Sequence, residues 1–234
     1  MFCDDFECHG CQVKFVRDKC FPKGEVKLDK NMTTSHEIED LLYDNLIPKE
    51  IFLGVYPRDH LPKEKLASHP YAMCVVNTHK SGLPGQHFVA IIKDRKRLLF
   101  FDSSATPEFY QLFQDDLEQL AEKGGLKLWK NTCPIQYDVS NACGYYCIWF
   151  LLKYYFYRPC SIKDMTTLFF ESFCHGEKPG PREMKWRQER LVNEIIVNME
   201  RIINRRHMMK VLKECGMPIN YNFNDFESCK IYYR

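Results

Sequence analysis

The sequence lacks an excess of charge of either sign. Among its 234 residues, 33 Lys and Arg stand against 31 Asp and Glu, which leaves a net charge of +2. This balance excludes polybasic nucleic-acid binders and acidic tail proteins, which are recognised by their bulk charge. Internal repeats and low-complexity segments are also missing, which excludes repeat architectures. Hydrophobic residues make up 45% of the chain, as in ordinary globular proteins.

Long hydrophobic runs are missing as well. The longest, residues 142–152, is about half of the ~20 residues that a bilayer requires, and Lys153 ends it. The N-terminus is acidic and lacks the basic start and apolar centre of a signal peptide. We therefore expect an intracellular protein without a membrane contact.

Cysteine, by contrast, is abundant, with twelve residues. Without a secretion signal, such cysteines indicate free thiols, metal ligands or catalytic groups rather than disulfides. We expect a reducing compartment.

The pattern along the chain indicates the α+β class. We predict an N-terminal extension that contains cysteines over residues 1–45, a core over 46–180, and a helical part over 181–234 that packs on the core. β-type runs and helical runs alternate irregularly, which predicts a small, mainly antiparallel sheet packed with helices, one of them buried in the centre. The expected strands are 71–77, 87–92, 98–102, 126–129 and 135–137, and the expected helices are 107–123, 142–157, 162–173 and 183–213.

The charged residues 93–97 separate two apolar runs and predict a β-hairpin. If its turn is centred between Asp94 and Arg95, His87 and Asp102 are directly opposed on antiparallel strands. Opposed residues have Cβ atoms ~4.5–5.5 Å apart, so the carboxylate can bond the imidazole. A His held in this way has a fixed tautomer, as a general base requires.

Cys143 lies at the expected start of the buried helix. Asn141 is a good N-cap, which places Cys143 in the first turn, where backbone N–H groups and the helix dipole stabilise a thiolate. Gly144 leaves room for a substrate backbone. Gln136, seven residues earlier, can donate to a developing oxyanion together with the Cys143 N–H.

Spacing alone leaves structural explanations open. A single His at the start of a strand is usually structural. Cys147, one turn after Cys143 in an apolar helix, is expected to be a buried, inert thiol.

Several short motifs occur in one order: 51–56 (IFLGVY), 72–78 (AMCVVNT), 85–88 (GQHF), Phe101-Asp102, Gln136 and 141–144 (NACG). In this combination the chain resembles the adenovirus protease (adenain) family. The order His, Asp or Glu, Gln, Cys also resembles the ubiquitin-like-protein proteases, which share that fold. The family's acid is often Glu and its His is often followed by Trp. Here these positions are Asp102 and Phe88, as in a divergent member from an adenovirus-like virus or an integrated virus-like element.

The resemblance implies a cysteine endopeptidase with 46–180 as its catalytic core. In it, His87 would be the general base, Asp102 its orienting acid, Gln136 the oxyanion donor and Cys143 the nucleophile, with Gly144 at the substrate. The chemistry would need no cofactor. The implied substrates are precursor proteins of the viral capsid and core, which a monomer would cleave in the host nucleus and in the virion.

Adenovirus enzymes are also stimulated by DNA and by a small peptide linked through a disulfide, so the resemblance raises both as activators. The nearest candidate thiol, Cys133, lies only three residues before Gln136, which does not match the spacing expected for peptide activation.

Two further segments allow two interpretations each. The cysteines at positions 3, 8, 11 and 20 (Cys3, Cys8, Cys11, Cys20) are either zinc ligands, since Cys8 and Cys11 have ligand spacing, or ordinary thiols. Residues 182–213 carry nine Lys and Arg against four Glu. This helix either contacts DNA phosphates or is an ordinary solvated face.

Two alternative functions remain at this stage. One is an isopeptidase of the deubiquitinase or deSUMOylase type, which would act on Gly-Gly tails rather than internal peptide bonds. The other is a catalytically silent protein that binds DNA or capsid.

Overall fold

The computed structural model describes residues 34–43, 47–136 and 141–157, together with 185–186, 189–190, 192–193 and 196–197. The chain divides into two compact units, of which Lys30–Asn193 holds every strand described below. The other unit joins Met1–Asp29 to Glu194–Arg234, and only 196–197 of it are described. The predicted domain boundaries stay predictions.

Five strands form one mixed sheet in the order β1-β2-β3-β4-β5. They are β1 (Phe52–Pro57), β2 (Ala72–Asn77), β3 (Phe88–Lys93), β4 (Arg97–Phe101) and β5 (Lys127–Lys130). The β2–β3 and β3–β4 pairs are antiparallel, whereas the outer pairs β1–β2 and β4–β5 are parallel. The α+β class is confirmed, and antiparallel pairing holds for the three central strands.

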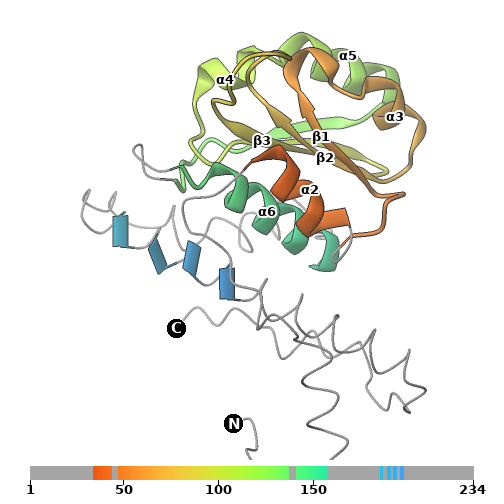
Figure 1. Cartoon of the computed structure of the whole chain (residues 1–234). Helices are drawn as coiled ribbons and strands as arrows, with labels where there is room; N and C mark the ends of the chain where they lie inside the picture. Colours follow the sequence, from red (N-terminus) through yellow and green to blue (C-terminus); the bar gives the residue numbers. More distant parts are fainter. Residues whose placement is uncertain are drawn as a thin grey trace, which may run out of the picture. The chain divides into compact units, whose positions relative to one another are not determined.

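Helices cover both faces of this sheet (Figure 1). On one face lie α2 (Ser35–Tyr43) and α6 (Cys143–Tyr157); on the other lie α3 (Lys63–Ser68), α4 (Pro107–Gln111) and α5 (Gln114–Gly124). A short 3₁₀ helix, η2 (Arg58–His60), follows β1. Strands β2 and β3 are therefore buried along almost their whole length.

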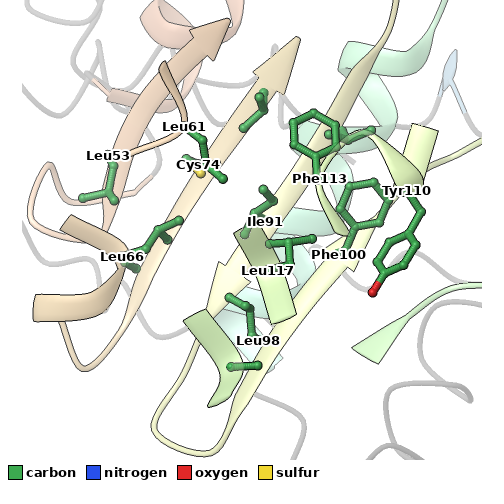
Figure 2. Close-up of a cluster of buried hydrophobic side chains, with 14 residues drawn as sticks. Leu53, Leu61, Leu66, Cys74, Ile91, Leu98, Phe100, Tyr110, Phe113 and Leu117 are labelled. Carbon is green, nitrogen blue, oxygen red and sulfur yellow. The ribbon is translucent and has the colours of Figure 1, made fainter. Parts of the chain in front are cut away.

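Side chains of each strand alternate between two apolar layers. On the side of α3 and α5, Val89 and Ile91 of β3 and Phe100 of β4 pack in a buried cluster (Figure 2). On the side of α6, Phe101 of β4 stacks on Phe150 with ring centroids 4.2 Å apart. Because each face of the sheet is covered by an apolar layer, the sequences of β3 and β4 are almost continuously hydrophobic.

The helix predicted over 107–123 is two helices, α4 and α5. They are separated near Phe113, whose side chain is buried and whose N–H donates to the carbonyl of Tyr110 in a tight turn. Gly125 ends α5 with a left-handed φ of 59°, a conformation that glycine adopts without strain. The predicted stop at the glycine pair is therefore confirmed.

Some predicted elements differ from the structure or lie beyond what it describes. Residues 135–136 do not form a strand, and the expected helix 162–173 lies outside the described residues. Within the predicted helix 183–213, the eight described residues are helical. Among the described helices, none has the length and apolar character needed to cross a membrane.

Candidate functional site

The strand directions bring several chain segments to one edge of the sheet. Because β3 alone runs opposite to the other four strands, its first residue lies beside the last residues of its neighbours. His87 directly precedes β3, Asp102 directly follows β4, and Asn131 directly follows β5. The sheet therefore places these three residues close together although 44 positions separate the first from the last.

The predicted register of the β3–β4 hairpin is wrong by two residues. Ala90 is paired with Phe101 and Lys93 with Leu98, so the turn is centred between Arg95 and Lys96. The side chain of Asp94 explains the shift, since its Oδ1 accepts hydrogen bonds from the backbone N–H groups of Lys96 and Arg97 at 2.8 and 2.7 Å.

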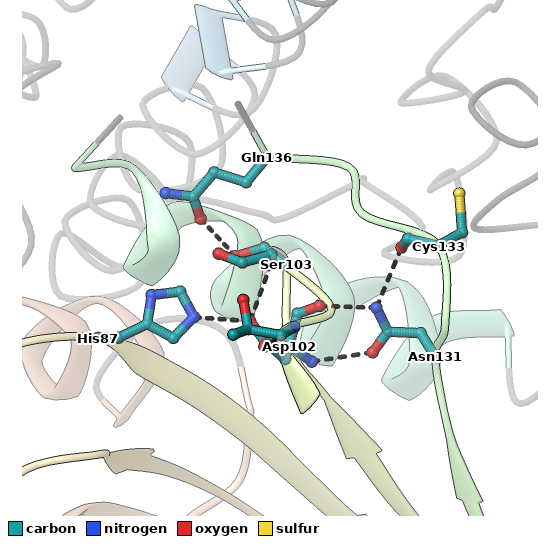
Figure 3. A network of polar contacts seen from close by, with 8 residues as sticks. His87, Asp102, Ser103, Asn131, Cys133 and Gln136 are labelled. Atoms are coloured by element: carbon teal, nitrogen blue, oxygen red, sulfur yellow. Dashed lines mark hydrogen bonds and ion pairs between the residues drawn. The ribbon is translucent and has the colours of Figure 1, made fainter. Parts of the chain in front are cut away.

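His87 and Asp102 are nevertheless in contact. In the observed register they are diagonal neighbours rather than opposed residues, and a diagonal pair is still within reach of long side chains. His87 Nε2 donates to Asp102 Oδ1 over 2.7 Å, and both side chains are buried (Figure 3). The predicted pair is thus present through a different pairing geometry.

The Asp102 carboxylate is fixed by the loop that follows it. Its Oδ1 also accepts the Ser104 N–H at 2.9 Å, and its Oδ2 accepts the Thr106 N–H at 2.8 Å. One face of the His87 ring is covered by Phe109 of α4, whose ring centroid lies 4.6 Å away at an interplanar angle of 13°. Both members of the pair are therefore held in one orientation.

Cys143 is the first residue of α6. The carbonyl of Ala142 accepts the first intrahelical bond, from Tyr146, so Ala142 occupies the N-cap position, one residue later than predicted. The expected place of Cys143 in the first turn is confirmed. Its N–H belongs to the four at a helix start that have no acceptor within the helix. Gly144 follows it in the same turn and is buried.

Cys143, like Asp102, hydrogen-bonds the imidazole of His87, and the two partners together determine the charge state of the ring. Burial acts to lower the pKa of His87, but hydrogen bonds to Asp102 and Cys143, together with their charges, outweigh it and raise the pKa to about 9. Since Asp102 occupies Nε2, Nδ1 is the ring nitrogen that is left for the thiol. The ring therefore stays protonated at neutral pH between two acidic groups.

Cys147 provides a contrast within the same helix. It lies one turn beyond Cys143 and is fully buried. Burial, followed by the charges of Cys143 and Asp102, raises the pKa of the Cys147 thiol well above its usual value. Cys147 is thus an inert core thiol, as the sequence predicted.

Gln136 joins the group through Ser103. The hydroxyl of Ser103 donates to Gln136 Oε1 over 2.5 Å, and both side chains are buried. The amide nitrogen of Gln136 points away from Ser103 (Figure 3). Because Ser103 follows Asp102 directly, Gln136 is attached to the segment that orients His87.

Asn131 and Ser103 are site residues that the sequence analysis missed. The Asn131 amide bonds both backbone groups of Asp102: Oδ1 accepts its N–H at 2.9 Å, and Nδ2 donates to its carbonyl at 2.6 Å (Figure 3). Nδ2 also donates to the Cys133 carbonyl at 3.2 Å. Ser103 follows the predicted site residue Asp102 directly, and this position could have identified it. The contact of Asn131 with the site depends on the β4–β5 pairing, which the sequence does not reveal.

The described residues contain no group of three or more His, Cys, Asp and Glu side chains that could hold a metal ion. The zinc candidates Cys3, Cys8, Cys11 and Cys20 lie outside the described residues, so that prediction stays open.

One comparison with known proteins, the match to a family model, agrees with the chemistry of this group. A family model described as adenovirus endoprotease matches residues 52–178, slightly more than half of the chain. No curated protein matches the sequence. Among solved structures, the chain is similar to the central domain of an uncharacterized protein from Legionella pneumophila, at 19% identity and a TM-score of 0.36. That match covers 78% of this chain and 99% of the other.

Proposed function

The chain belongs to the adenovirus endoprotease family of cysteine proteases, and from this premise we propose that it is an endopeptidase that cleaves viral capsid and core precursor proteins during virion maturation. The contact of one imidazole with both Asp102 and Cys143 is the observation that supports it best. A carboxylate that bonds an imidazole, which in turn contacts a thiol, provides the components of an activated nucleophile.

Cys143 acts as the nucleophile in this proposal, and His87 carries the proton. The Cys143 sulfur attacks the scissile carbonyl and forms a C–S bond, and the His87 Nδ1–H protonates the leaving amine as the C–N bond breaks. Water then attacks the acyl-enzyme while His87 accepts its proton, and the thiolate leaves. Asp102 keeps the imidazole oriented and stabilises its positive charge.

The negative oxygen formed in both steps requires fixed donors. The Cys143 N–H at the start of α6 and the Gln136 side-chain amide are the donors in this proposal. The helix dipole of α6 adds a positive partial charge at the same end. Gly144, which has no side chain, allows the substrate backbone to approach.

The same proposal covers the setting of the enzyme. We place its substrates in a virus-like particle, and its activity in the nucleus of an infected cell and in the virion. DNA and a peptide remain proposed activators, with the basic segment 182–213 as the DNA contact and no cofactor in the chemistry itself.

Alkylation of the full-length protein by iodoacetamide tests the nucleophile directly. We expect Cys143 to be labelled first, and this selectivity to be lost in His87→Ala. Cys147→Ser is the matched control in the same helix and should leave the labelling unchanged. Slow and uniform labelling of all exposed cysteines would contradict the proposed nucleophile.

Substrate profiling then separates the proposal from the alternatives. Cleavage of internal bonds in peptide mixtures, abolished by Cys143→Ala, supports an endopeptidase. Release of a group from the C-terminal Gly-Gly tail of ubiquitin or SUMO alone would indicate an isopeptidase instead. Binding to DNA or capsid protein without turnover, unchanged in Cys143→Ala, would indicate a silent binding protein.

A further inference from the structure

We propose that Ser103 is a positioning residue that orients the Gln136 side-chain amide, so that the amide N–H groups face the reacting carbonyl and not the protein interior. The inference rests on the proposed function, because it assigns Ser103 a role in the same acyl transfer. Ser103 touches neither substrate nor thiol in this scheme and acts only through Gln136.

Both the side chain and the backbone carbonyl of Ser103 form hydrogen bonds. Its side chain is fully buried, and its hydroxyl donates to Gln136 Oε1 at 2.5 Å. Its carbonyl accepts two backbone hydrogen bonds, from Ile135 N–H at 2.8 Å and from Gln136 N–H at 2.9 Å. Both the backbone and the side chain of Gln136 are thus fixed by one residue.

Orientation matters because the two ends of a carboxamide have opposite polarity. The NH₂ group stabilises a nearby oxyanion, whereas the carbonyl oxygen repels it, and the two ends have nearly the same shape. A hydrogen bond to Oε1 holds the oxygen against Ser103 and directs Nε2 the other way (Figure 3). Without the hydroxyl, the buried Oε1 loses this donor, and the contact that distinguishes the two ends of the amide is gone.

The position of Ser103 in the chain adds a coupling. Asp102 orients the base and Ser103, the next residue, orients the oxyanion donor. The Asn131 amide bonds both the N–H and the carbonyl of Asp102 and so holds the backbone that carries the two residues. A single short segment after β4 therefore aligns two functional groups that approach the substrate from different elements.

Peptide hydrolysis by Ser103→Ala tests the inference. We expect kcat to fall about 10–100-fold, part of the ~10²–10³ typical for loss of one oxyanion donor, with KM nearly unchanged. Ser104→Ala is the matched control, because Ser104 binds Asp102 through its backbone N–H and its hydroxyl has no such role. Full kcat in Ser103→Ala would overturn the positioning role.

Two further measurements distinguish a positioning role of Ser103 from a general structural role in the site. Alkylation of Cys143 by iodoacetamide forms no oxyanion, so its rate should be unchanged in Ser103→Ala. In a Gln136→Ala background, Ser103→Ala should cause no additional loss of kcat. If alkylation fell in parallel with hydrolysis, or if the two substitutions were additive, Ser103 would be a structural residue only.

A substrate-free measurement keeps this inference distinct from the proposed function. The side-chain amide NMR signals of Gln136, assigned by their loss in Gln136→Ala, should shift in Ser103→Ala and not in Ser104→Ala. Unchanged signals would overturn the role of Ser103 even in an active protease. Failure of the proposed function would appear differently, as wild-type protein without peptide cleavage or selective labelling of Cys143.

Discussion

The β3–β4 hairpin carries an aspartate at each end, and the two carboxylates are fixed by similar contacts. Asp94, in the turn, accepts the N–H groups of Lys96 and Arg97 and the hydroxyl of Tyr154. Asp102, at the open end, accepts two backbone N–H groups from its following loop and the Nε2–H of His87. Each aspartate therefore binds its own loop and one ring from elsewhere in the chain.

The two ends differ in whether the partner of the aspartate can change its charge within the accessible pH range. Arg97 forms an ion pair with Asp94 at 2.7 Å and keeps its charge. The hydroxyl of Tyr154 stays protonated, because burial and the bond to Asp94 raise its pKa. His87 is the exception, since an imidazole gains or loses a proton at accessible pH. The same loop chemistry thus fixes a structural ion pair at one end and, in the proposed mechanism, the group that transfers a proton at the other.

The largest difference between the two aspartates is expected when each is replaced by Asn. Asp102→Asn should lower kcat/KM by about 10²–10⁴-fold, the usual contribution of an oriented acid–base group, and leave slow residual cleavage. Asp94→Asn should leave kcat/KM within about twofold. Peptide hydrolysis under identical conditions checks both, and equal losses in the two variants would contradict the assignment of roles.

The second prediction concerns how the free energy of unfolding depends on pH through His87, the partner of Asp102. A folded-state pKa of about 9 for His87, above the unfolded 6.5, means that the folded protein binds this proton more tightly. The resulting stabilisation is complete below about pH 6.5 and is lost as pH rises through 9. It is on the order of 3 kcal/mol, since one pKa unit is worth ~1.4 kcal/mol. Denaturant unfolding at pH 6.5 and 9.5 measures the stabilisation, and the difference between the two pH values should be smaller in Asp102→Asn.

Removal of the turn carboxylate should affect stability instead of activity. Asp94→Ala leaves buried donors of Tyr154 and the turn without an acceptor, at a cost of about 1–3 kcal/mol in the free energy of unfolding. Burial opposes ionisation of Asp94, but hydrogen bonds from Tyr154 and Arg97 outweigh it and lower its pKa. Its contribution is therefore present above pH 3.8 and lost as pH falls below. Urea unfolding at pH 7 and pH 3 tests this, and a kcat/KM loss comparable to that of Asp102→Asn would refute it.

The smallest expected effect is that of Tyr154→Phe. The variant removes one hydroxyl from Asp94 and keeps the ring, so we expect a loss of about 1 kcal/mol and normal kcat/KM. In an Asp94→Ala background the same substitution should cost much less, because its acceptor is already gone. Additive losses in the double variant would show that the hydroxyl has another role.

Patterns in the sequence were sufficient for those site residues that border regular elements. Cys143 could be located because the apolar run of α6 begins beside it, and His87 and Asp102 because each borders an apolar strand. The predicted contact between His87 and Asp102 is correct although the predicted register is not, because a shift of two residues leaves every side chain on the same face of the sheet. The register itself depends on hydrogen bonds from the Asp94 side chain, which hydrophobic patterns do not report.

Other parts of the site depend on contacts between distant segments. Asn131 reaches Asp102 because β5 pairs with β4 in parallel across the intervening α4 and α5, and nothing local in the sequence specifies that pairing. The bond between Ser103 and Gln136 likewise joins two loops without periodicity. The fold class could be predicted, whereas these side-chain bonds required the three-dimensional arrangement.

The stacked rings of Phe101 and Phe150 have a consequence for how the protein unfolds on heating. Phe101 directly precedes Asp102, and Phe150 lies about two turns after Cys143 on the same helix. The rings are buried, so the strand that carries the acid and the helix that carries the nucleophile cannot separate without exposing the core. We therefore expect the site to have no independent melting step, so that any loss of activity on heating coincides with global unfolding.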